Sequence, residues 1–72
     1  MQNLGERLKA VRRRFGMSQE ELATRSGVEQ ASLERVECGK RNYLRSDHLG
    51  RIAEALDVPA DELLGIRDFK GV

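Results

Sequence analysis

The chain has 72 residues, of which 13 are basic and 12 acidic, so its net charge of +1 does not by itself indicate a nucleic-acid binder. This length suits a single domain, near the lower size at which a core is stable without metal or disulfides, and the single cysteine excludes an intramolecular disulfide. The sequence has no apolar run long enough to cross a membrane and no signal-peptide pattern, so we expect a cytoplasmic protein in a reducing compartment.

The first predicted element is an amphipathic helix over residues 4–15 that stops at Gly16. Its apolar residues recur at helical spacing and form an inward stripe that consists of Leu4, Leu8, Val11 and Phe15. Three arginines run along the same helix. Arg12 flanks the apolar stripe, whereas Arg13 and Arg14 are compatible with a solvated face.

Two short helices are predicted next, over residues 18–26 and 29–38, and a turn at Gly27 joins them. Ser18 can cap the first of these helices, with Glu21 three residues further on to complete an S-x-x-E capping box. Glycine tolerates a positive φ at no steric cost, so Gly27 suits the bend between the helices.

The second of these short helices is predicted to have two different sides. Leu33 and Val36 face inward, with Glu37 partly so, and the free side carries Ala31, Glu34, Arg35 and Cys38. A small residue, Ala23, lies where the two helices would cross. Two helices joined by a short glycine-bearing turn match the DNA-binding helix-turn-helix pattern, in which the second helix enters the major groove.

The last third of the chain is predicted to hold a loop and two further helices. Residues 40–46 lack helical periodicity and include three basic residues, so they are expected to form the loop. Ser46 or Asp47 is expected to cap a helix over residues 47–56, and Pro59 begins a short helix that ends at Gly65. No strand pattern occurs, so residues 1–72 are expected to form one all-α domain with a tail over 65–72.

These motifs together resemble the Cro/C1-type, or Xre-like, family of helix-turn-helix repressors. The resemblance covers roughly residues 4–64, and its motifs fall at Val11-Arg12, Ser18 to Ala23, Gly27-Val28, Leu33 to Gly39, and Ile52 to Val58. It implies a five-helix lambda-repressor-like fold. It also implies a sequence-specific transcriptional regulator, expected to be a repressor that binds a palindromic site on double-stranded DNA as a dimer.

Several residues of the third helix suit the chemistry of the major groove. An amide can bond bidentately to adenine, an arginine to guanine, and a small apolar group can contact the methyl group of thymine. Gln30, Ala31 and Arg35 are therefore expected to contact bases. The resemblance places Gln30 at a base-contacting position. It places Ser32 and Arg35 at positions used for base or phosphate contacts.

The resemblance also implies phosphate contacts and one structural ion pair. Gln19, at the start of the second helix, and Lys40 with Arg41 match phosphate-contacting positions. Arg12 matches an arginine that pairs with the glutamate near the end of the recognition helix, here Glu37, in a partly buried bridge. The full set of expected DNA-binding residues is Gln19, Gln30, Ala31, Ser32, Glu34, Arg35, Lys40 and Arg41.

Two acidic residues and the loop depart from the family's pattern. Glu29 stands where the family prefers a Ser or Thr cap. Glu34 could accept a hydrogen bond from cytosine, repel phosphate, or pair with a neighbouring base such as Arg41. The loop over residues 40–46 lacks the family's usual proline and is about one residue longer.

Two classes of function fit the sequence, a transcriptional regulator and a protein-interaction module of the same fold, such as an antitoxin-like or anti-repressor protein. Near-neutral charge and the two acids favour the second class. His48 has no second metal ligand near it in the sequence, so no metal site is expected. No catalytic motif is present, so we expect no enzymatic activity, no cofactor and no small-molecule substrate. Ile66 and Phe69 extend past the predicted core and suggest homodimer contacts, although they could instead fold back onto their own chain.

Overall fold

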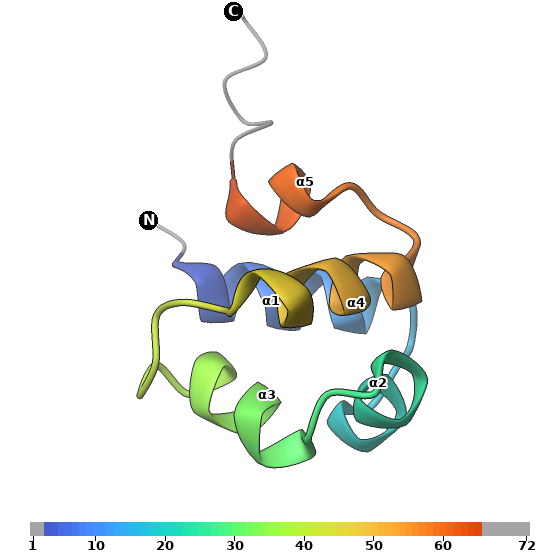
Figure 1. Ribbon diagram of the computed structural model, residues 1–72, viewed down its shortest axis with the longest axis horizontal. Coiled ribbons are helices and arrows are strands. Elements are labelled where there is room, and N and C mark those ends of the chain that lie inside the picture. The colour runs from blue at the N-terminus through green and yellow to red at the C-terminus, as the bar shows by residue number, and fades with distance from the viewer. Residues whose placement is uncertain (1–2, 66–72) are drawn as a thin grey trace, which may run out of the picture.

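The computed structural model describes residues 3–65, which form five α-helices (Figure 1). The helices are α1 (Leu4–Arg14), α2 (Gln19–Ser26), α3 (Gln30–Glu37), α4 (Ser46–Leu56) and α5 (Ala60–Leu64). Every helix begins and ends within one residue of its predicted bounds. Within these residues no helix is long and apolar enough to cross a membrane.

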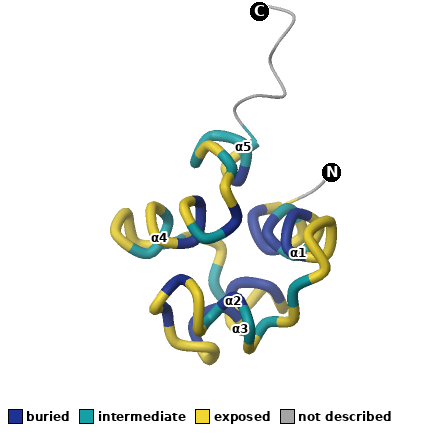
Figure 2. The backbone as a smooth tube through the Cα atoms, turned by 90° about the vertical axis from the view of Figure 1, so that its right-hand side faces the viewer, coloured by how far each residue is buried: buried dark blue, intermediate teal, exposed yellow. Residues whose placement is uncertain are grey.

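The helices surround one apolar core. Helices α1 and α4 overlap in Figure 1, but Figure 2 shows them on opposite sides of the molecule, with α5 above them and α2 and α3 below. The buried parts of all five helices turn toward the centre (Figure 2). The apolar side chains buried there are Leu4, Leu8, Val11, Leu22, Val28, Leu33, Val36, Ile52, Ala53, Leu56 and Leu63. The short helices α2 and α3 are therefore held by packing, because helices of eight residues are marginal in isolation.

The start of α1 is fixed by a capping box that the sequence analysis did not identify. The Asn3 side chain accepts from the backbone N–H of Glu6 at 2.9 Å, and the Glu6 carboxylate accepts from the backbone N–H of Asn3 at 3.3 Å. Each of these bonds satisfies a backbone donor that has no partner inside the helix.

The capping predictions for α2 and α4 need correction. Ser18 accepts from the backbone N–H of Glu21 at 3.0 Å, as expected, but the Glu21 carboxylate pairs with Arg25 at 3.1 Å, so only half of the predicted box forms. Neither Ser46 nor Asp47 caps α4. That helix begins at Ser46, and its cap position is Arg45, which makes no side-chain capping bond.

Phe15 was predicted to complete the buried stripe of α1, and this prediction is wrong. The helix ends at Arg14, so Phe15 is the cap residue and no longer lies in the helical register that would turn it inward. Its side chain is 47% exposed. The Arg14 guanidinium lies 5.9 Å from the centre of the ring, in cation–π geometry.

Helix α1 lies close against α3 at Gly5, which is buried. A Cβ atom at this position would overlap the backbone carbonyl oxygen of Val36 and lie 3.2 Å from the Cα of Glu37. A glycine is thus required for α1 to rest directly against the backbone of α3. This contact sets how the outer side of α3 is presented to solvent.

Candidate nucleic-acid interface

The turn between α2 and α3 is built as its sequence predicts. Gly27 ends α2 with φ of 75°, and its N–H donates to the carbonyl of Ala23 at 2.9 Å. Val28 follows and is buried, with its N–H donating to the Ser26 hydroxyl at 3.2 Å. The turn therefore satisfies its own backbone groups and anchors the start of α3 in the core.

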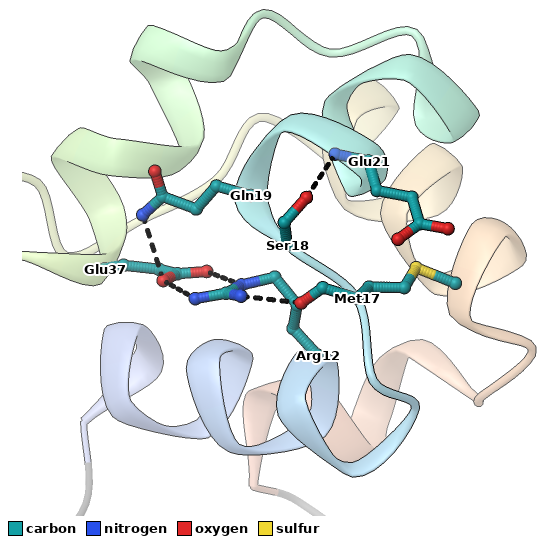
Figure 3. A network of polar contacts seen from close by, with 6 residues as sticks. All are labelled: Arg12, Met17, Ser18, Gln19, Glu21 and Glu37. Atoms are coloured by element: carbon teal, nitrogen blue, oxygen red, sulfur yellow. Dashed lines mark hydrogen bonds and ion pairs between the residues drawn. The ribbon is translucent and has the colours of Figure 1, made fainter.

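A buried polar network holds α3 against α1 and α2 (Figure 3). Arg12 donates to both carboxylate oxygens of Glu37, from Nε at 2.8 Å and from Nη2 at 2.7 Å, and its Nη1 donates to the carbonyl of Met17 at 2.7 Å. The amide nitrogen of Gln19 donates to Oε1 of Glu37 at 3.1 Å. The predicted pair of Arg12 and Glu37 is thus present, and it joins α1, the segment before α2, α2 and α3.

The network keeps both partners charged. Burial on its own would raise the pKa of Glu37, but hydrogen bonds from Arg12 and Gln19 and the charges of Arg12 and Lys9 outweigh it and lower that pKa below 4.5. The hydrogen bond to Glu37 raises the pKa of Arg12 above its ordinary value. A bidentate, charge-assisted pair of this kind has a fixed geometry, so it fixes the orientation of α3 relative to α1.

The outer side of α3 is exposed, whereas its inner side is buried. Leu33 and Val36 have no exposed surface, and Ser32, one of the predicted contact residues, is buried with 8% of its surface exposed. The predicted contact residues that remain on the surface are Gln30, Ala31, Glu34 and Arg35. They form one continuous stripe, because residues three and four apart are neighbours on a helix.

The loop after α3 places two further basic residues next to this stripe. Gly39 has φ of 89°, and the backbone N–H of Arg41 donates to the carbonyl of Arg35 at 3.1 Å, which folds the loop back on the end of α3. Lys40 is exposed, and the Arg41 guanidinium lies 5.3 Å from the centre of the Tyr43 ring. Lys40 and Arg41, the two residues expected to contact phosphate, therefore follow directly on the end of α3.

Gln19 has a role that sequence reasoning missed. It was expected to contact phosphate, yet its amide nitrogen is engaged by Glu37, and the side chain is only half-buried. It is the first residue of α2. Its remaining amide groups stay near the surface at the start of that helix, so it belongs to the supporting network as well as to the edge of the candidate interface.

The predicted tail contacts, Ile66 and Phe69, lie outside the described residues, so the structure places neither of them. Within residues 3–65, no group of three or more His, Cys, Asp or Glu side chains is arranged to hold a metal ion.

The chain matches a family model described as a helix-turn-helix domain over residues 3–64. It is 38% identical, over 64 residues, to the HTH-type transcriptional repressor RghR of Bacillus subtilis, a match that covers 89% of this chain and 47% of RghR. The chain thus spans about half the length of this curated relative.

Two solved structures share the arrangement of helices. The crystal structure of the restriction-modification controller protein C.AhdI from Aeromonas hydrophila has a TM-score of 0.78 at 36% identity, covering 85% of this chain and 91% of that one. The N-terminal DNA binding domain of SinR from Bacillus subtilis has a TM-score of 0.80 at 30% identity, covering 83% and 87%. The expected five-helix fold is confirmed. The relatives are named as regulators rather than enzymes, in agreement with the prediction of no enzymatic activity.

Proposed function

This chain belongs to the helix-turn-helix domain family, and from that membership we propose that it is a DNA-binding transcriptional regulator. Its activity would be repression, as the name of RghR describes for that protein. Helix α3 would lie in the major groove of double-stranded DNA, where an α-helix fits and base edges are accessible.

The observation that carries this proposal is the division of α3 into two sides. The inner side is locked to the core by Leu33, Val36 and the bonds of Glu37. The outer side presents an amide, a methyl group and a guanidinium, from Gln30, Ala31 and Arg35, which are groups that recognise adenine, thymine and guanine. A rigidly held helix with such a face is suited to reading base pairs.

The phosphate contacts would come from the two ends of the α2–α3 unit. Gln19 lies at the start of α2, and Lys40 and Arg41 lie just after α3. Contacts of this kind hold a protein in register on the duplex and carry no sequence information. Ser32 is left out of the proposed contacts because it is buried.

Arg35 and Lys40 should differ in what their removal does to binding. If Arg35 reads a base, Arg35→Ala should cost about 1–3 kcal/mol on the preferred site and weaken the preference at one position. Lys40→Ala, the matched control, should weaken binding to all sequences alike, because Lys40 would touch only phosphate. Affinities for the preferred duplex and for single-base variants of it measure both effects. If both variants lose the same affinity for every duplex, Arg35 contacts phosphate and does not recognise a base.

We further propose that the protein binds a palindromic operator as a homodimer. Helix-turn-helix proteins usually place two recognition helices about 34 Å apart on DNA, since one small module buries little surface there. Ile66 and Phe69 would supply the contact between the two copies. Sedimentation at micromolar concentration should give the mass of two chains, and Ile66→Asp should give that of one. A single-chain mass for the unaltered protein throughout would contradict the dimer.

A protein-interaction module of the same fold is the second candidate, and the charge of the surface favours it. Glu29 and Glu34 are both exposed, and neither takes part in an ion pair within residues 3–65. Two carboxylates near the proposed groove-facing side weaken the attraction to a polyanion. Absence of salt-dependent DNA binding would support this candidate over the first.

A further inference from the structure

Glu34 lies in the middle of the exposed stripe of α3. It follows Gln30 and Ala31 by four and three residues, so all three share one helix face, and Arg35 is its direct neighbour. The side chain is exposed, and its backbone carbonyl already accepts from the N–H of Cys38 at 2.9 Å. Any partner that meets Gln30 and Arg35 must therefore also meet the carboxylate of Glu34.

This carboxylate is not neutralised within the described part of the chain. The expected pairing with Arg41 does not form, because the Arg41 guanidinium lies against the Tyr43 ring instead. Arg35 makes no ion pair with it either. Glu34 would thus bring an unpaired carboxylate into a groove lined by phosphates, which is unfavourable unless the DNA offers it a hydrogen-bond donor.

The major groove offers few such donors. Cytosine presents its N4 amino group there, and a carboxylate is the side chain that accepts from it. Adenine also presents an amino group, but its N7 acceptor lies alongside and would repel the second carboxylate oxygen. Guanine and thymine present oxygen or nitrogen acceptors at this edge, so they offer the carboxylate no hydrogen bond.

We propose that Glu34 is a specificity-determining residue that requires cytosine at one position of each half-site. It acts in two ways: the N4 amino group of cytosine satisfies the carboxylate, whereas guanine and thymine offer it no donor and adenine sets a repelling acceptor beside its donor. Discrimination by an unfavourable contact with wrong partners is an established route to specificity. This inference rests on the proposed DNA-binding function. It goes further by naming the base that Glu34 recognises.

Binding sites selected from random duplexes with three proteins test the proposal. The unaltered chain should favour cytosine at one position by about 5- to 150-fold over the other bases. Glu34→Gln should prefer adenine at that position, because an amide bonds bidentately to adenine. Glu34→Ala should lose preference there and bind non-specific DNA about two- to tenfold more tightly, since a repelling charge is gone.

The outcomes separate this proposal from the one on which it rests. Glu34 is exposed, so both variants should have the melting temperature of the unaltered protein. The base preferences at the other positions of the site should not change. If Glu34→Ala keeps the same base preferences, or if the base that depends on Glu34 is not cytosine, the assignment of Glu34 is overturned and DNA binding stands. If the unaltered chain selects no sequence and binds no duplex, the proposed function itself fails.

Discussion

Glu37→Ala is expected to lower the free energy of unfolding by about 3–5 kcal/mol. The Glu37 side chain is 2% exposed and that of Arg12 is 10% exposed, so the substitution leaves a guanidinium buried without its counter-charge. Gln19 loses its acceptor at the same time. Because domains have about 5–15 kcal/mol of stability in total, the variant should lose a large share of its stability and melt at a clearly lower temperature.

Glu21→Ala is the matched control for this substitution. Glu21 also pairs with an arginine, Arg25, at 3.1 Å, but the two side chains are 43% and 57% exposed. An exposed pair contributes at most about 1 kcal/mol, so this variant should melt near the unaltered protein. Denaturant unfolding followed by circular dichroism measures both. Equal stability of the Glu37 variant and the unaltered chain would contradict a buried pair.

The same pair should make the fold sensitive to acid. The pKa of Glu37 is lowered in the folded state, so its ionised form stabilises the fold fully above its unfolded pKa, near 4.5. That contribution is lost as the pH falls through the lower folded-state pKa. The difference in stability between the unaltered protein and Glu37→Ala should accordingly be constant near neutral pH and shrink below about pH 4.5.

Gly5→Ala is expected to destabilise the fold by about 1–3 kcal/mol, although alanine is the better helix former. The new methyl group would overlap the Val36 carbonyl, which is backbone and cannot rotate aside. Helix α1 would have to move away from α3, and the neighbouring bonds between Arg12 and Glu37 would lengthen or break. Affinity for DNA should therefore fall together with stability.

Gly50 provides the control for Gly5. It lies inside α4, and a Cβ atom built on it has no neighbouring atom within 4 Å. Gly50→Ala should thus raise stability by about 0.5–1 kcal/mol through helix propensity alone. Thermal unfolding of the two variants gives opposite shifts if α1 and α3 touch at Gly5. A rise in melting temperature for both would show that the helices have room between them.

Sequence periodicity and turn residues were sufficient for the helices and for the turn between α2 and α3. The spacing of Leu4, Leu8 and Val11 predicted the inner stripe of α1, and Gly27 predicted the turn between α2 and α3. These are local signals, since each depends on residues within one or two turns of one another. The resemblance to helix-turn-helix repressors added the pair of Arg12 and Glu37, which no local pattern indicates.

The features that the sequence analysis missed depend on contacts between distant parts of the chain or on single helix ends. Gln19 and Glu37 are 18 residues apart, and their hydrogen bond exists only because α2 and α3 fold together. The need for Gly5 arises from the backbone of Val36, far along the chain. Phe15 was misplaced because a helix that ends one residue earlier turns its next side chain to solvent. Neither local propensity nor spacing determines such details.

The central claim is that α3 and the basic residues that follow it bind double-stranded DNA. The salt dependence of DNA binding is its most direct test. With Lys40 and Arg41 on phosphates in each of two copies, the logarithm of the affinity for the selected site should fall linearly with the logarithm of salt concentration, with a slope of about −4. Affinity should then drop roughly 100-fold or more between 50 and 200 mM salt. Binding that is absent at low salt, or that stays constant over this range, would contradict the account.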